Sequence, residues 1–178
     1  MHKENSISII DRYGIRLRPV DINDAEFIIK LRNNVAINKH ISPTSDKLSD
    51  QIEWIKGYKE REKKGLEYYF LTEVNGERFG TTRLSELNNE IFELGSWVFS
   101  KESPSGVSIK ADILTKEVGF DYLGFEFCKF NVRKANTNVL KYHLHYNPII
   151  VDEDELNIYF NLSKTSFNIN KTRFLKLL

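Results

Sequence analysis

The segment EYYFLTEVNGERFGTTRL, residues 67–84, is the part of the sequence that most narrows the possible folds. Aromatic, aliphatic and β-branched residues stand on both sides of Asn75-Gly76, a dipeptide that favours the positive φ angles of a type I′ turn. The pattern therefore predicts a β-hairpin, with two neighbouring antiparallel strands near the middle of the chain.

Segments with strand or helix periodicity alternate on both sides of this hairpin. Alternating apolar and polar residues predict strands at 15–20, 90–100, 125–132 and 155–162, with a further short strand near 149–151. Apolar residues at helical spacing predict helices at 21–34, 46–63, 107–123, 136–146 and 166–178. This alternation predicts an α/β fold.

The composition is that of a packed globular protein with balanced charge. The 178 residues suit one domain spanning 1–178, with 40% hydrophobic and 12% aromatic residues to fill its core. Lys and Arg number 26, and Asp and Glu number 25. This balance gives no reason to expect nucleic acid or an anionic membrane as a partner.

The cysteine content and the N-terminal segment bear on localisation. The single cysteine, Cys128, cannot form an internal disulfide, and its place in the strand pattern FEFCKF predicts a core side chain rather than a nucleophile. The first ten residues contain no apolar region of a signal peptide, and no apolar run approaches the length of a membrane span. The sequence therefore predicts a cytoplasmic protein.

A short segment, KESPSGVSIKA at 101–111, joins a predicted strand to a predicted helix. One interpretation is an ordinary connection in which Ser103 or Ser105 caps the helix. The other is an anion site, because the unpaired backbone N–H groups and the dipole of a helix N-terminus bind phosphates. Gly106 would then mark the closest approach of the backbone to the ligand. The segment by itself leaves both interpretations open.

Three stretches carry a resemblance to a known family. They are ELGSWVFSKESPSGVSIKA at 93–111, KANTNVLKYHLHYNP at 134–148, and LRNN at 31–34 with QIEWIKGYKER at 51–61 and the hairpin after it. Together with the order of elements, they resemble the GCN5-related N-acetyltransferases, the GNAT superfamily, over nearly the whole chain. The first stretch is similar to the branch that acetylates ribosomal proteins. The third is similar to the sugar-nucleotide N-acetyltransferases of bacterial surface-polysaccharide pathways.

Several positions depart from the pattern of that family. The Arg or Gln at the head of its phosphate loop is Ser103 here, its first loop glycine is Pro104, and a later Gly or Ala is Ser108, so Gly106 is the one loop glycine. Asn147-Pro148 replaces the Gly-Phe that ends the second motif. Serines can stand where glycines usually do, because the atoms that bind phosphate belong to the backbone.

The resemblance implies a fold and an acyl donor. The fold is a mixed, mostly antiparallel central sheet with helices on both faces, and the donor is acetyl-CoA, with no metal involved. Two splayed strands, 90–100 and 126–132, would expose their backbone to the pantetheine arm. The residues that the resemblance places against acetyl-CoA are Val98, Phe99, Ser103, Ser105, Gly106, Val107, Ser108 and Asn136. Asn136 can also be interpreted as a plain helix cap.

The resemblance also places the catalytic groups. His143 occupies the slot from which the family protonates the departing thiolate, and a free imidazole, with a pKa of about 6.5, can donate a proton at neutral pH. Tyr142, one residue away, is the alternative acid. Glu93 lies where related enzymes place a carboxylate that draws a proton from the acceptor amine, and His40 lies where they contact the acceptor. The alternatives are a packed His143, a solvent-facing Glu93 and a surface His40.

The sequence therefore predicts an acetyl-CoA-dependent N-acetyltransferase, in which a primary amine attacks the thioester directly. The preferred acceptor is a small molecule, an amino sugar on a nucleotide carrier, because of the third stretch. One alternative acceptor is the α-amine of a protein such as a ribosomal subunit. Another reading is a degenerate module that binds acyl-CoA without catalysis, which the substituted phosphate loop favours. The chain is expected to be a monomer or a homodimer.

Overall fold

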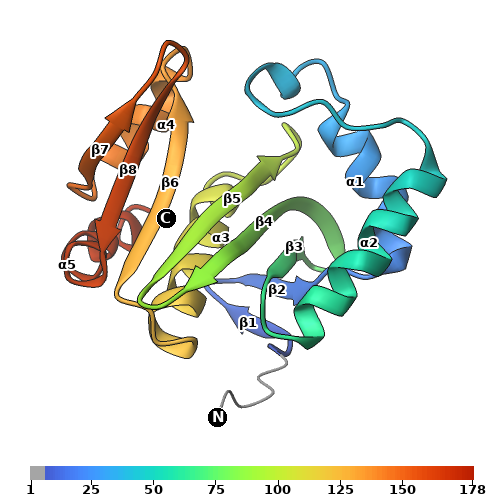
Figure 1. The fold of residues 1–178 in the computed structure, drawn as a ribbon, viewed down its shortest axis with the longest axis horizontal. Coiled ribbons are helices and arrows are strands. Elements are labelled where there is room, and N and C mark those ends of the chain that lie inside the picture. Colours follow the sequence, from blue (N-terminus) through green and yellow to red (C-terminus); the bar gives the residue numbers. More distant parts are fainter. Residues whose placement is uncertain (1–6) are drawn as a thin grey trace.

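The computed structural model describes residues 7–178, which form one eight-stranded sheet in the order β1-β2-β3-β4-β5-β6-β8-β7 (Figure 1). The strands are β1 (Ile10–Arg12), β2 (Ile15–Pro19), β3 (Tyr68–Val74), β4 (Glu77–Asn88), β5 (Ile91–Phe99), β6 (Phe127–Arg133), β7 (Ile149–Glu153) and β8 (Asn157–Ser163). The α-helices are α1 (Ala25–Arg32), α2 (Leu48–Lys63), α3 (Val107–Glu117), α4 (Thr137–Leu144) and α5 (Lys164–Leu175). Short helical turns are η1 (Ile22–Asp24), η2 (Asn38–His40) and η3 (Val118–Tyr122). Residues 1–6, part of the segment on which the absence of a signal peptide is predicted, lie outside the described residues.

The predicted mixed, mostly antiparallel sheet is confirmed. Of the neighbouring strands, only β5 and β6 run parallel among residues 7–178, and the other pairs are antiparallel. The predicted hairpin of β3 and β4 turns at Asn75 and Gly76, whose φ angles are 51° and 82°. The sequence pattern did not predict β1. It pairs with β2 across a turn at Tyr13-Gly14, where both φ angles are positive.

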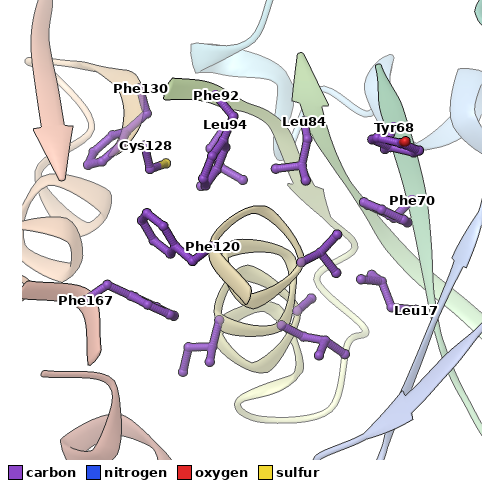
Figure 2. Packing of buried hydrophobic residues seen from close by; sticks show 14 of the residues in the cluster. Leu17, Tyr68, Phe70, Leu84, Phe92, Leu94, Phe120, Cys128, Phe130 and Phe167 are labelled. Atoms are coloured by element: carbon purple, nitrogen blue, oxygen red, sulfur yellow. The ribbon is translucent and has the colours of Figure 1, made fainter. Parts of the chain in front are cut away.

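The two faces of the sheet carry separate apolar clusters, because neighbouring residues of a strand point to opposite faces. In β3, Tyr68 and Phe70 belong to the cluster that includes α3, whereas Tyr69 and Leu71 pack with α1 and α2. Figure 2 shows the first cluster, in which side chains from the strands and Phe167 of α5 surround a helix. Helices therefore cover both faces, as predicted.

Residues 111–120, in α3 and the first part of η3, are buried on almost every side. The helical spacing in 107–123 predicts an apolar stripe of Val107, Ala111, Leu114, Val118 and Tyr122. The first four are buried, but Tyr122 is 58% exposed. The prediction is wrong at Tyr122 because the α-helix ends at Glu117 and a π-turn follows, which changes the angular spacing of side chains. Among residues 7–178, no helix is both long and apolar enough to cross a membrane.

A split between β5 and β6 opens the middle of the sheet. The two strands pair over Ile91–Glu93 and Phe127–Lys129, and Figure 1 shows them separating beyond that point. A bulge at Ser96, where φ is 49°, shifts the register of β5 against β4. Past Glu93, the facing edges of β5 and β6 have no partner strand in the part of the chain that the structure describes.

Candidate active site

The start of α3 forms an uncapped helix N-terminus beside the end of β5. Gly106 is the N-cap residue, with a φ of 79° that favours glycine, and the ladder of the helix begins where Lys110 N–H donates to Gly106 O at 2.9 Å. The Ser103 hydroxyl instead donates to Ser100 O at 2.7 Å, so the expectation that Ser103 or Ser105 caps the helix is wrong. The Val107 N–H donates to Pro104 O at 3.2 Å, so the later N–H groups of the first turn, together with the helix dipole, are the ones left to attract an anion.

The other residues predicted to contact the acyl donor lie around this helix start. Val98 and Val107 are buried, whereas Ser105 is exposed and Ser108 is half-buried. The Trp97 indole N–H donates to Ser108 O at 2.9 Å and so joins β5 to the first turn of α3. Phe99 lies with its ring against Gly80 of β4, where an added β-carbon would come within 2.3 Å of the ring.

The segment before α4 places Asn136 at the helix start without using it as a cap. Asn136 is the N-cap residue, as expected, but its side chain makes no capping hydrogen bond. Its side chain is half-buried. An amide that does not serve the helix keeps donors and an acceptor for another polar group.

His143 lies across the split between β5 and β6. Its ring centroid is 5.5 Å from that of Trp97 on β5 and 4.5 Å from that of Phe130 on β6. The side chain is 4% exposed, and burial, together with the nearby Lys116 ammonium, lowers the pKa of His143 to about 3. The ring is therefore neutral at pH 7, and the ordinary imidazole pKa expected from the sequence does not apply here. Its Nδ1 has no hydrogen-bond partner among residues 7–178.

Tyr142 points from α4 toward α3. Its hydroxyl donates to Asp112 Oδ2 at 2.5 Å and lies 3.0 Å from the Tyr146 hydroxyl. Burial and the charge of Asp112 raise the pKa of Tyr142 well above its usual value, so the phenol keeps its proton. The structure thus places a protonated phenol next to a neutral imidazole.

Glu93 is the last residue of β5 before the strands separate. Its side chain is 30% exposed, and its carboxylate lies 3.8 Å from Lys129 Nζ. Burial and the neighbouring Glu86 raise the pKa of Glu93, which makes it a stronger base than an ordinary glutamate. Cys128 nearby is fully buried, and burial raises the pKa of its thiol, which fits the predicted core role.

A cavity of about 310 Å³ lies on the opposite face of the sheet, between α1, α2 and the strands. Its polar walls include Arg32 of α1, Asp50 of α2 and Arg83 of β4, and its apolar walls include Trp54 and Tyr69. Ser96 also lines the cavity. Because Ser96 is the bulge of the strand that borders the split, the cavity reaches the place where β5 leaves β6.

Two guanidinium groups face this cavity. Arg32 donates through Nε to Thr44 Oγ1 at 2.6 Å and thereby holds the loop before α2. Arg83 forms an ion pair with Glu67 at 3.5 Å, but its Nε has no hydrogen-bond partner among the described residues. Although Arg83 Nε is buried, the Arg83 side chain is 30% exposed, and the two guanidinium groups give the cavity wall a positive charge.

His40 ends η2 and is half-buried. It does not line the cavity, although the loop that follows it does so at residues 43–45. The sequence interpretation missed Arg32, Trp54 and Arg83. They come from three separate elements, and only the fold brings them together. Among residues 7–178, no cluster of three or more His, Cys, Asp or Glu side chains could hold a metal ion.

Comparisons with known proteins bear on this arrangement. The family model described as "Acetyltransferase (GNAT) domain" matches residues 15–145. The solved structure described as apo FdhC, a nucleotide-linked sugar GNAT, is 36% identical, with a TM-score of 0.82 and coverage of 94% of both chains. No curated protein sequence matches the chain.

Two more distant structures share the fold. Ribosomal-protein-S5-alanine acetyltransferase from Vibrio fischeri is 15% identical, with a TM-score of 0.75, over 87% of this chain and 96% of that one. RimJ of Mycobacterium smegmatis, in complex with CoA-disulfide, is 16% identical, with a TM-score of 0.77, over 92% and 88% of the two chains. The family match over residues 15–145 and the 36% identity to the first structure show that the chain belongs to the GNAT N-acetyltransferases, a family of acyltransferase enzymes that use acetyl-CoA.

Proposed function

We propose that this acyltransferase moves the acetyl group of acetyl-CoA to the amine of a sugar carried on a nucleotide. The observation that carries the proposal is the cavity beside the Ser96 bulge, with Arg32 and Arg83 in its walls. Its volume, about 310 Å³, is at the lower end of the range for small-molecule sites. The similarity to a structure described as a nucleotide-linked sugar GNAT supports the same acceptor class.

The charge of the cavity fits a diphosphate better than a peptide N-terminus. Guanidinium groups bind phosphate oxygens through paired, charge-assisted hydrogen bonds. A peptide N-terminus is itself cationic near pH 7, and two guanidinium groups would repel it. Asp50 lies in the same wall and can accept hydrogen bonds from sugar hydroxyls.

Acetyl-CoA would lie on the other face of the sheet. The uncapped start of α3, at Ser105, Gly106 and Ser108, suits its pyrophosphate. The free backbone edges of the split suit the amides of pantetheine, and the Asn136 side chain is available at the mouth of α4. The thioester would then reach the split from one side and the acceptor amine from the other.

Catalysis would consist of proton transfers around a directly attacking amine. Near pH 7 the amine is mostly protonated, so Glu93, through water, takes a proton before attack. The attack forms the N–C bond, and collapse of the tetrahedral intermediate breaks the C–S bond. Tyr142 would then turn its hydroxyl from Asp112 toward the departing thiolate and give it the proton, and a proton from water would restore the phenol. His143, which is neutral, contributes a ring N–H or lone pair to the reacting group, and His40 contacts the acceptor from the loop.

A thiol-release assay tests the acceptor class. With acetyl-CoA as donor, kcat/KM should be highest for nucleotide-linked amino sugars, because only they offer both a primary amine and phosphates. The matched controls are the same amino sugar without its nucleotide, the nucleotide without the amine, and N-terminal peptides. A higher kcat/KM for an N-terminal peptide would contradict the proposal and indicate protein acetylation instead. If none of these amines causes release of thiol, the proposal is overturned and the chain is an acyl-CoA-binding module.

A further inference from the structure

A glutamine interrupts the apolar face of α2 that packs on the sheet. The buried residues of this helix are Gln51, Ile55 and Tyr58, and their spacing places them on one side of it. Ile55 and Tyr58 are completely buried and belong to the apolar cluster on this face of the sheet. Gln51, which is 8% exposed, puts a carboxamide in line with them. Glutamine is mostly exposed in folded proteins, and a buried amide is normally hydrogen-bonded.

The side-chain amide of Gln51 has no hydrogen-bond partner among residues 7–178. Within the same residues, the only other carboxamide of comparable burial is Asn170 of α5, which is 6% exposed and donates to Ser166 O at 2.9 Å. The amide of Asn170 therefore serves the fold. The amide of Gln51 keeps two N–H donors and a carbonyl oxygen for a group that is not part of the fold.

Gln51 lies on the inner side of the cavity between α1, α2 and the strands. The rim of the cavity is formed by exposed residues, which are Pro43, Ser45, Asp50 and Trp54. The inner wall contains the buried residues Ile28, Gln51 and Tyr69. Because Gln51 is almost fully covered by protein and lines this wall, the space that its amide meets is the cavity.

The sugar ring is the part of a nucleotide-linked amino sugar that would meet Gln51. A cavity of about 310 Å³ is at the lower end of the range for small-molecule sites, so part of such an acceptor is enclosed and the rest passes over the rim. The amine has to reach the split at Ser96, which lines the same cavity, so the sugar is the enclosed part. The guanidinium groups of Arg32 and Arg83 attract the phosphates, which leaves the ring hydroxyls for the amide.

We propose that Gln51 is a specificity-determining residue, which hydrogen-bonds a ring hydroxyl of the amino sugar and selects sugars that carry a hydroxyl at that position. The inference rests on the proposed acceptor class. A hydroxyl both donates and accepts, so it can pair with either end of the carboxamide. A sugar that lacks this hydroxyl would leave a buried amide unpaired, and sites built to bind a hydroxyl strongly reject analogues without it.

The test compares the wild type with Gln51→Met in the thiol-release assay, using a nucleotide-linked amino sugar and its monodeoxy analogues as acceptors. Methionine keeps the unbranched shape but removes the amide. For the wild type, one analogue should have a kcat/KM at least tenfold below that of the parent sugar. Gln51→Met should lower kcat/KM for the parent sugar by a similar factor, with no further loss for that analogue, because the bond is already missing. The KM for acetyl-CoA should stay unchanged.

The melting temperature separates a role in binding from a role in packing. Gln51→Met should melt at or above the temperature of the wild type, because the amide has no partner in the fold to lose. The matched control, Asn170→Leu, removes an amide that does have a partner and should lower the melting temperature. It should leave the ratio of kcat/KM between the parent sugar and each analogue as in the wild type. A lower melting temperature in Gln51→Met with an unchanged ratio would show a packing role and overturn the inference.

The wild type separates failure of this inference from failure of the proposed function. If it acetylates no nucleotide-linked amino sugar, the acceptor class falls and the inference falls with it. If it acetylates the parent sugar and every monodeoxy analogue equally well, only the role of Gln51 is overturned. Gln51→Asn, which keeps the amide but is one methylene shorter, is the second variant if Gln51→Met fails to fold. It should weaken the same preference, and a wild-type ratio in that variant would overturn the inference.

Discussion

Tyr142→Phe is expected to lower kcat by about 10²–10⁴-fold, with little change in the KM for acetyl-CoA. The substitution removes one oxygen and keeps the ring contacts with Trp97 and Phe174. The thiolate would then leave without a proton from the enzyme. Since that proton is needed only in the transition state, turnover should fall more than binding. Steady-state kinetics with acetyl-CoA and a nucleotide-linked amino sugar would measure both constants.

The neighbouring hydroxyl provides the control. Tyr146→Phe removes a fully buried hydroxyl that lies 3.0 Å from that of Tyr142 but is not bonded to Asp112, and it should cost much less activity. His143→Gln keeps a neutral polar group and should retain more turnover than Tyr142→Phe. The reason is that the imidazole is already neutral at pH 7 and has no extra proton to donate. A larger loss in His143→Gln than in Tyr142→Phe would return the donor role to His143.

Arg83→Met is expected to lower kcat/KM for a nucleotide-linked acceptor on the order of 10–100-fold, mainly through KM, because charge-assisted hydrogen bonds to the phosphates disappear. Methionine keeps the apolar stem that packs in the sheet. For the amino sugar without its nucleotide, kcat/KM of the same variant should stay close to that of the wild type. Comparison of the two acceptors in one assay isolates the phosphate contact.

Arg78→Met is the matched control for this substitution. Arg78 lies on the same strand, pairs with Asp24 at 3.5 Å, and does not line the cavity. It should leave the acceptor KM unchanged. Equal effects of Arg83→Met on both acceptors would mean that the arginine supports the fold or the amine rather than the phosphates.

The sequence was sufficient for the order of elements because local signals agree with the fold. Asn75-Gly76 specifies the turn between β3 and β4, and Asp21, a residue type that favours the N-cap, accepts a hydrogen bond at the start of η1 through its side chain. The bulge at Ser96 has no such signal, since a serine in an alternating strand normally continues the alternation. Its position depends on the hydrogen bond that Thr81 of the neighbouring strand donates to Ser96 O.

The electrostatic state of the site could not be predicted from the sequence. The pKa of His143 depends on rings from β5 and β6 and on the ammonium of Lys116, and none of these is near in the chain. Asp112 and Lys116 would be expected on a solvated face of an amphipathic helix, but α3 is surrounded on nearly all sides. Burial that complete is decided by the whole fold, because α3 packs against β2, β4 and β5 of the sheet and against α5, and Tyr142 of α4 covers Asp112.

The neutral ring of His143 also links the stability of the whole fold to acid. In the unfolded chain the ring titrates at about pH 6.5, whereas in the folded protein the pKa of His143 is lowered to about 3. Between pH 3 and pH 6.5 the ring is therefore protonated in the unfolded state but not in the native state. The free energy of unfolding should therefore decrease by about 1.4 kcal/mol for each pH unit below about 6.5, until the folded ring also titrates. Denaturant melts of the wild type and His143→Gln at a series of pH values would show this slope as the difference between the two proteins, and parallel curves would contradict it.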